Sequence, residues 1–230
     1  QWQVNNLRLA GLSWGDPGEK PLLALHGWLD NAASFACLAP LLTGYRVVAL
    51  DLTGHGRRDR RSADARHRPA RRETPQALGW HKFGLIGHSR GAIIATLLAG
   101  TFPERVHHLI LLDAVSPKAV AESNFPTQLR RALLEKPSLL SSSNRVFANI
   151  EEAVASRCGR GLSAAAARLL VQRNLRICPQ GVTWTTDPRL RGASAVKLTE
   201  GQSQAVLRAL NMPTLLMLAD ASSRRAPEVL

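Results

Sequence analysis

The turn at residues 87–91, Gly-His-Ser-Arg-Gly, is the sequence feature that most constrains the fold. An apolar run at 83–86 precedes it, and a run of small and apolar side chains follows at 92–99. This order predicts a buried strand, a sharp turn and a helix, with a serine hydroxyl at the strand tip and at the positive end of the helix dipole. We therefore predict that Ser89 is a nucleophile. The neighbours that would shape and support the turn are Gly87, His88 and Gly91.

Further apolar runs predict more buried strands, and helical segments separate them. The predicted strands are 21–25, 46–52, 109–112 and 212–218, the predicted helices are 31–42, 90–102 and 202–210, and residues 1–14 alternate as a short antiparallel strand pair does. Strands that alternate with helices imply an α/β fold with a mostly parallel sheet and flanking helices, which is the fold class we predict. Functional side chains then gather at the carboxyl ends of the strands, where Ser89 and Asp113 both lie.

Residues 116–200 differ in character, because helical periods replace the strands. Helices are predicted at 129–134, 150–158 and 163–174, and Ser163 is a suitable N-cap for the last of them. We expect 1–115 to form the first part of a core domain, 116–200 a helical lid over the strand ends, and 201–230 an incomplete second part of the core. Apolar lid residues favour either a hydrophobic acyl pocket or packing of the lid helices on each other; they are Leu139, Leu140, Val146, Phe147, Leu169 and Leu170.

Composition and charge limit the classes of protein to consider. With 230 residues, 45% of them apolar, the chain can bury the core of a globular domain, and no apolar run reaches the roughly 18 residues that span a bilayer. The three cysteines have no metal-ligand spacing, so we expect reduced thiols, no bound metal and a cytoplasmic location.

The net charge is +13, yet the arginine-rich tract at 57–72 has no aromatic side chain to stack on bases. We predict a solvated loop there and no nucleic-acid partner.

Several stretches together resemble the α/β-hydrolase superfamily and, within it, a serine-hydrolase-like branch. They are residues 25–35, 51–56, 87–91, 102–106, 169–173 and 186–190, and the resemblance covers 7–58 and 77–219. It implies a serine hydrolase that acts on an ester-like small molecule through Ser89, without a cofactor. It also implies an oxyanion hole formed by the backbone N–H groups of Trp28 and Arg90, with His26 and Gly27 supporting the loop. The Arg90 side chain either binds an anionic group of the substrate or lies along the helix surface.

The acid and the base of a catalytic triad are less clear in this sequence. Asp113 ends an apolar strand and is our first candidate for the acid, while Asp220, after the later strand, is the alternative. The family's catalytic histidine lies near the C-terminus, whereas the last histidine of this chain is His108. We therefore expect a chain truncated at its C-terminus, with weak or no activity. The alternatives are a catalytically dead α/β-hydrolase-fold binding protein and a binder of nucleic acid or anionic surfaces.

The stretch at about 57–76 departs from the family pattern. Relatives carry an amphipathic helix there, whereas this chain has an arginine-rich and apolar-poor sequence. Loss of a helix that packs on the sheet would reduce apolar burial. A pair of compensating frameshifts in a GC-rich gene is our hypothesis for this stretch.

Overall fold

The computed structural model describes residues 2–4, 7–56, 78–159 and 161–219. The arginine-rich stretch at 57–76 and Asp220 therefore lie outside the described residues. The elements before the sheet are β1 (Trp2–Val4) and β2 (Leu7–Leu9), which form a separate antiparallel pair.

The central sheet positions the candidate catalytic residues Ser89 and Asp113. Over the described residues its strand order is β11-β7-β6-β4-β5-β3. The strands are β3 (Gly11–Trp14), β4 (Lys20–Leu25), β5 (Tyr45–Leu50), β6 (Phe83–His88), β7 (Val106–Leu112) and β11 (Thr214–Met217). All neighbouring pairs are parallel except β3 with β5, so the carboxyl ends of five strands meet at one edge. The predicted α/β fold with a mostly parallel sheet is confirmed.

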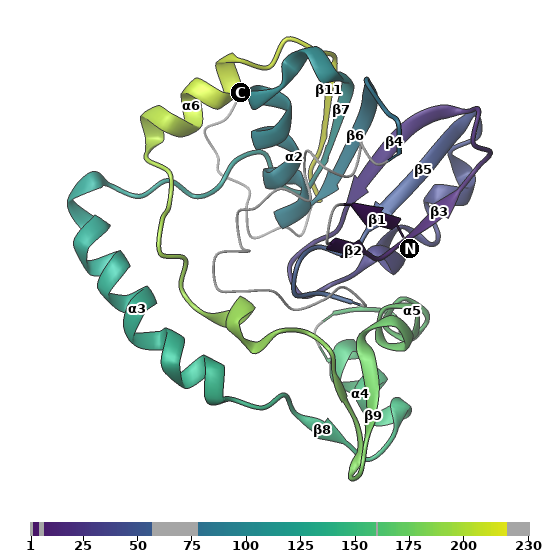
Figure 1. Cartoon of the computed structure of the whole chain (residues 1–230), viewed down its shortest axis with the longest axis vertical. Helices are drawn as coiled ribbons and strands as arrows, with labels where there is room; N and C mark the ends of the chain where they lie inside the picture. Colours follow the sequence, from purple (N-terminus) through teal and green to yellow (C-terminus); the bar gives the residue numbers. More distant parts are fainter. Residues whose placement is uncertain (1, 5–6, 57–77, 160, 220–230) are drawn as a thin grey trace.

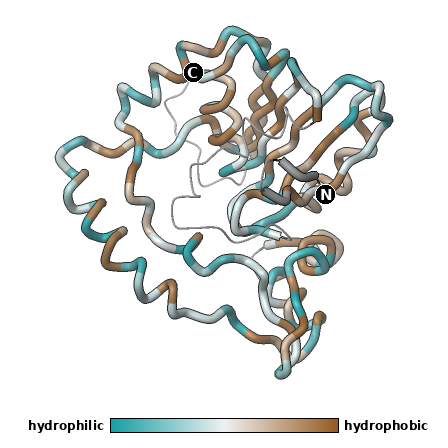
Figure 2. The backbone as a smooth tube through the Cα atoms, viewed as in Figure 1, coloured by the Kyte–Doolittle hydropathy of each residue, from teal (hydrophilic) through white to brown (hydrophobic). Residues whose placement is uncertain are grey.

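Apolar layers cover both faces of the sheet, because successive strand residues point to opposite sides. In β4, Leu23 and Leu25 join the core formed with α2 (Arg90–Thr101), while Leu22 and Ala24 join the core on the other face. That second core includes the short 3-10 helices η1 (Ala32–Phe35) and η2 (Ala39–Leu41). Helix α6 (Glu200–Arg208) packs beside α2 (Figure 1). The short helix η4 (Pro103–Arg105) leads into β7. Figure 2 shows the strands and α2 as the most hydrophobic part of the backbone.

Residues 122–191, which we call the cap, leave the sheet after β7 and return before α6. The elements of the cap are η5 (Glu122–Asn124), α3 (Phe125–Ser141), β8 (Val146–Phe147), α4 (Ile150–Cys158), α5 (Ala164–Asn174), β9 (Leu175–Cys178), β10 (Gly181–Trp184) and η6 (Pro188–Arg191). A small core around Phe147, Ala153 and Val171 joins α4 and α5 to the cap strands. Figure 1 shows α3 as a long helix at the outer side of the molecule.

The structure corrects three of the predicted elements. The predicted buried strand at 212–218 forms β11, but all four residues of β11 are exposed, because it lies at the edge of the described sheet. Residues 31–42 form η1 and η2 instead of one helix, because the Asn31 side chain caps only a short turn and Pro40 starts a second one. The 116–200 stretch is not purely helical, since β8, β10 and β9 form a three-stranded antiparallel sheet there. The strands escaped prediction because each has at most four residues. The N-cap at Ser163 is confirmed, since its side chain accepts a hydrogen bond from the Ala166 N–H.

Two features are absent from the described part of the chain. It contains no helix whose length and hydropathy would allow it to cross a membrane. Its histidine, cysteine and acidic side chains form no group of three that could hold a metal ion.

Candidate active site

Ser89 occupies a strained turn between β6 and α2. Its backbone has φ 51° and ψ −114°, and its N–H donates to the Leu112 carbonyl at 2.7 Å while its own carbonyl accepts from the Ile93 N–H at 3.1 Å. These two bonds fix the turn to β7 on one side and to α2 on the other. The residue as a whole is half-buried. A Cβ at Gly91 would lie 1.9 Å from the Leu25 carbonyl oxygen, which explains why a glycine follows.

Backbone strain is concentrated at this edge of the sheet. Within the described residues, the non-glycine residues with positive φ are Leu29 at 61°, Ser89 at 51° and Asp113 at 60°. They lie just beyond the carboxyl ends of β4, β6 and β7, which are adjacent strands. A non-glycine residue in this region costs on the order of 1–3 kcal/mol, and such residues cluster at functional sites.

Asp113 is held beside Ser89 by the strand register. In the parallel register of β6 and β7, His88 pairs with Leu112. Ser89 and Asp113 are the residues that directly follow these two. The Asp113 N–H donates to the Met217 carbonyl at 2.8 Å, and one carboxylate oxygen accepts from the Ala219 N–H at 3.5 Å. Asp113 thus bridges the ends of β7 and β11 while its carboxylate remains half-buried.

His26 fixes the loop that follows β4. It is fully buried; its Nε2 accepts from the Leu52 N–H at 2.9 Å, and its Nδ1 lies 2.7 Å from the Gly27 carbonyl oxygen. An N–H donor to Nε2 requires an unprotonated Nε2, so the proton sits on Nδ1 and donates to Gly27. Burial, reinforced by the charge of neighbouring His55, lowers the pKa of His26 from 6.5 to about 3. His26 therefore acts as a neutral cross-link between the ends of β4 and β5.

His55 makes an equivalent cross-link, between the turn at residues 54–56 and the loop after β4. Its Nε2 accepts from the Leu29 N–H at 3.3 Å, and its Nδ1 lies 3.1 Å from the Thr53 carbonyl oxygen. Its ring packs edge-on against His26 at 5.0 Å between centroids. Burial lowers the pKa of His55 to about 4, and the positive charge of Arg90 contributes in the same direction. The Arg90 side chain thus acts electrostatically on the turn at residues 54–56, although its orientation toward a substrate stays a prediction.

Trp28 joins the loop to the cap. Its indole N–H donates to the Leu190 carbonyl at 3.1 Å, and 48% of the residue is exposed. No acceptor for the backbone N–H of Trp28 is present among the described residues. Gly27 allows close packing here, because a Cβ on it would lie 2.9 Å from Nδ1 of His88. His88 therefore packs against the loop after β4.

Two buried or nearly buried ion pairs attach the cap to the strand ends. Arg173 of α5 binds both oxygens of the Asp51 carboxylate, at 3.0 and 2.8 Å, and the Asp51 side chain is fully buried. Arg157 of α4 contacts Asp30 at 2.5 Å. Local sequence patterns do not predict these pairs, because the partners lie 122 and 127 residues apart.

None of the histidines that the structure describes hydrogen-bonds the Ser89 hydroxyl. The nitrogens of His26 and His55 are committed to backbone partners, and His88 packs against Gly27. His107 is exposed, whereas His108 is half-buried and packs edge-on against Tyr45.

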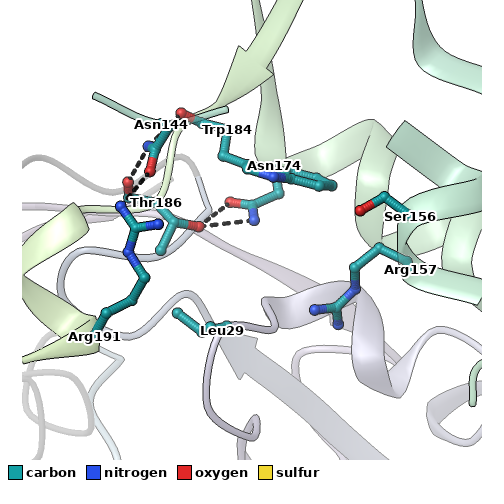
Figure 3. A pocket seen from close by; sticks show the side chains of 8 residues that line it. All are labelled: Leu29, Asn144, Ser156, Arg157, Asn174, Trp184, Thr186 and Arg191. Atoms are coloured by element: carbon teal, nitrogen blue, oxygen red, sulfur yellow. Dashed lines mark hydrogen bonds between the residues drawn. The ribbon is translucent and has the colours of Figure 1, made fainter. Parts of the chain in front are cut away.

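A cavity of about 90 Å³ lies between the cap and the loop after β4 (Figure 3). Its lining is Leu29, Asn144, Ser156, Arg157, Asn174, Trp184, Thr186 and Arg191. Most of the lining residues have polar or charged side chains, and none of them is an apolar lid residue considered for an acyl pocket. Phe147 and Leu170 are buried, whereas Leu140 and Val146 are largely exposed. Arg191 directly follows one of the stretches that carry the resemblance, residues 186–190, and no sequence motif singled it out.

Comparison with known proteins assigns the family. Residues 20–147, more than half of the chain, match the family model described as alpha/beta hydrolase fold. This chain belongs to the α/β-hydrolase family. A crystal structure of a hypothetical protein from Pseudomonas aeruginosa PAO1 is 40% identical with a TM-score of 0.91, and the match covers 95% of this α/β hydrolase and 79% of that chain. A thioesterase domain from the curacin biosynthetic pathway is 28% identical with a TM-score of 0.84, over 98% of this chain and 83% of that one.

Curated relatives place this α/β hydrolase in the serine-hydrolase-like branch. Serine hydrolase-like protein 2 of Homo sapiens is 33% identical, with 80% of this chain and 62% of that protein covered. The serine hydrolase-like protein of Danio rerio is 29% identical, with 92% of this chain and 68% of that protein covered. The chain thus spans about two thirds of the length of these relatives.

Proposed function

We propose that this α/β hydrolase is a serine hydrolase that transfers the acyl group of a small carboxylic ester or thioester to water, with Ser89 as nucleophile. The observation that carries the proposal is the strained backbone of Ser89 at the tip of β6, where this half-buried residue precedes the first turn of α2. A helix N-terminus favours the negative charge that develops during attack on a carbonyl. The likeness to a thioesterase domain supports acyl transfer as the reaction class.

The oxyanion donors in this proposal are the backbone N–H groups of Arg90 and Trp28. Arg90 is the first residue of α2, whose N–H groups are directed toward the helix N-terminus. The Trp28 loop is immobilised by His26, by His55 and by the indole contact with the cap. Such immobilisation supports the role, because donors that are already oriented need no reorganisation during the reaction.

Asp113 is the carboxylate that we propose as the triad acid. Its position after β7 and beside the Ser89 turn supports this role. The base would be a histidine that Asp113 orients, since an unassisted serine hydroxyl is a poor nucleophile. Asp220 remains the alternative acid.

A second candidate function is that of a catalytically inactive α/β hydrolase that binds a small molecule. The observation that favours it is that no histidine of the described residues contacts the Ser89 hydroxyl.

A serine-directed fluorophosphonate probe distinguishes the two functions. We expect the probe to label this chain at Ser89 and the Ser89→Ala variant to lose the label. Hydrolysis of 4-nitrophenyl butyrate, which we expect to be weak because no described histidine contacts the Ser89 hydroxyl, should be lost with the label. Ser123→Ala, at an exposed serine of η5, is the matched control and should label normally. A chain that neither labels nor hydrolyses the ester would overturn the enzyme proposal in favour of the binding protein.

A further inference from the structure

We propose that the cavity between the cap and the loop after β4 is a binding site for a carboxylate group. In the proposed hydrolase, this carboxylate would lie at the end of the substrate remote from the reacting carbonyl. That part of the inference rests on the proposed function. Figure 3 shows the side chains of α4, the β10 region and η6 converging on the space above Leu29.

The size of the cavity limits what it can hold. Its volume of about 90 Å³ is far below the roughly 300–1,000 Å³ of pockets that enclose whole drug-sized ligands. It corresponds to about three molecules of liquid water, each of which occupies about 30 Å³. A carboxylate with one or two attached carbons fits this volume, so the site takes an end group while the rest of the molecule lies outside.

The hydrogen-bonding groups around the cavity select an acceptor. The Asn144 amide N–H group is committed to the Trp184 and Thr186 carbonyls, and Asn174 exchanges hydrogen bonds with the Thr186 hydroxyl. The Ser156 hydroxyl has no partner among the described residues, and Arg191 contacts only the Asn144 amide oxygen there, at 3.3 Å. The remaining capacity thus comes from guanidinium N–H groups and a hydroxyl, which suits a ligand with acceptor oxygens.

Charge favours an anion over a neutral acceptor. The lining includes two arginines and no acidic side chain. Asp30 neutralises Arg157, but the partner of Arg191 is a neutral amide, so one positive charge at the cavity remains uncompensated by the described residues. The planar guanidinium fork matches the two oxygens of a carboxylate, and the resulting pair is stronger than a bond between neutral groups.

The location of the cavity connects it to the proposed reaction centre. Leu29 lines the cavity and directly follows Trp28, whose backbone N–H is a proposed oxyanion donor. Consecutive Cα atoms lie about 3.8 Å apart, so the two sites share one loop. An ester whose acyl chain ends in a carboxylate could therefore place its two ends at the two sites, and Arg191 would determine specificity.

Calorimetric titration of the Ser89→Ala chain tests the site without turnover. The probes are monomethyl glutarate, which carries one carboxylate, and dimethyl glutarate, which is its neutral counterpart. We expect monomethyl glutarate to bind at least tenfold more tightly, as one charge-assisted contact provides. Arg191→Gln in the same background should abolish this preference, and Arg191→Lys should retain part of it. Arg176→Gln removes an equal charge from the exposed face of β9 and should change nothing.

Three outcomes would overturn the carboxylate site: equal affinity for the two probes, a preference that survives Arg191→Gln, or no binding of monomethyl glutarate at 20 mM. Near-ultraviolet circular dichroism of each variant confirms that the cap remains folded. Because binding is measured without Ser89, its result is independent of the labelling experiment. Carboxylate preference without Ser89 labelling would leave the site in place and remove only its role in hydrolysis.

Discussion

At the scale of single residues, the turn at Ser89 depends on close backbone contacts that leave no room for a side chain at Gly91. The Leu25 carbonyl lies where a Cβ of Gly91 would be, and the Ser89 N–H is bonded across to β7. The strain at Ser89 persists because both neighbouring elements hold it in place.

We expect Gly91→Ala to lower the free energy of unfolding by about 3 kcal/mol, since a methyl group would force β4 and α2 apart. Urea denaturation followed by circular dichroism measures the change. Gly201→Ala is the matched control, because a Cβ at Gly201 in α6 meets nothing within 4 Å. That substitution should stabilise the chain by about 0.5 kcal/mol. Equal effects of the two substitutions would show that the close approach at Gly91 is unimportant.

At the scale of elements, the cap is attached to the strand ends by a few polar contacts. Helix α5 provides Arg173 to the buried Asp51, and the Leu170 carbonyl of the same helix accepts from the Asn31 amide at 2.8 Å. The cap residues after β10 also bond to the turn at 54–56, through the Asp187 N–H and the Thr185 hydroxyl. These contacts involve the same loops that carry the proposed oxyanion donor, so cap attachment and site geometry are coupled.

We expect Arg173→Met to destabilise the chain by about 3 kcal/mol, because it leaves a buried carboxylate without its arginine. Arg168→Met provides a control on the same helix, since Arg168 pairs with Glu151 at the exposed surface. Exposed pairs contribute little, so its unfolding midpoint should stay close to that of the parent chain. The urea concentration at the midpoint of unfolding is compared between the two variants. Indistinguishable midpoints would contradict a structural role for the pair of Arg173 and Asp51.

At the scale of the whole molecule, two buried neutral histidines make folding sensitive to mild acid. The pKa values of His26 and His55 are about 3 and about 4 in the folded chain, below the ordinary 6.5. Between those values and 6.5 the unfolded chain binds protons that the folded chain does not. Their contribution to stability is therefore complete above pH 6.5 and is lost as the pH falls.

Each histidine should reduce the free energy of unfolding by about 1.4 kcal/mol per pH unit below 6.5, or about 2 kcal/mol at pH 5. Urea titrations at pH 7.5, 6.0 and 5.0 measure this slope, above the range in which most carboxylates titrate. His55→Gln should reduce the slope by about half, while His107→Gln, at an exposed position, should leave it unchanged. A stability that is flat from pH 7.5 to pH 5.0 would show that neither histidine is held neutral.

Local sequence by itself determined the sheet and the Ser89 turn. Continuous apolar runs specify the central strands β4, β5 and β6 because these strands are largely buried on both faces, and the glycines around Ser89 specify the sharp turn. The same local pattern identified Asp113 as a strand-end carboxylate. These features depend on neighbours within a few residues, so no knowledge of distant segments was needed.

Tertiary structure alone decided the strain at Leu29, the tautomers of His26 and His55, the attachment of the cap and the cavity beside Arg191. Each of these depends on partners that are far apart in sequence, such as Asp51 with Arg173 or Asn144 with Arg191. Their energies come from burial and from charges brought together by folding, and hydrophobic periodicity contains no information on such pairs. The turn that carries Ser89 and the strand end that carries Asp113 were therefore foreseeable from sequence, whereas their surroundings were not.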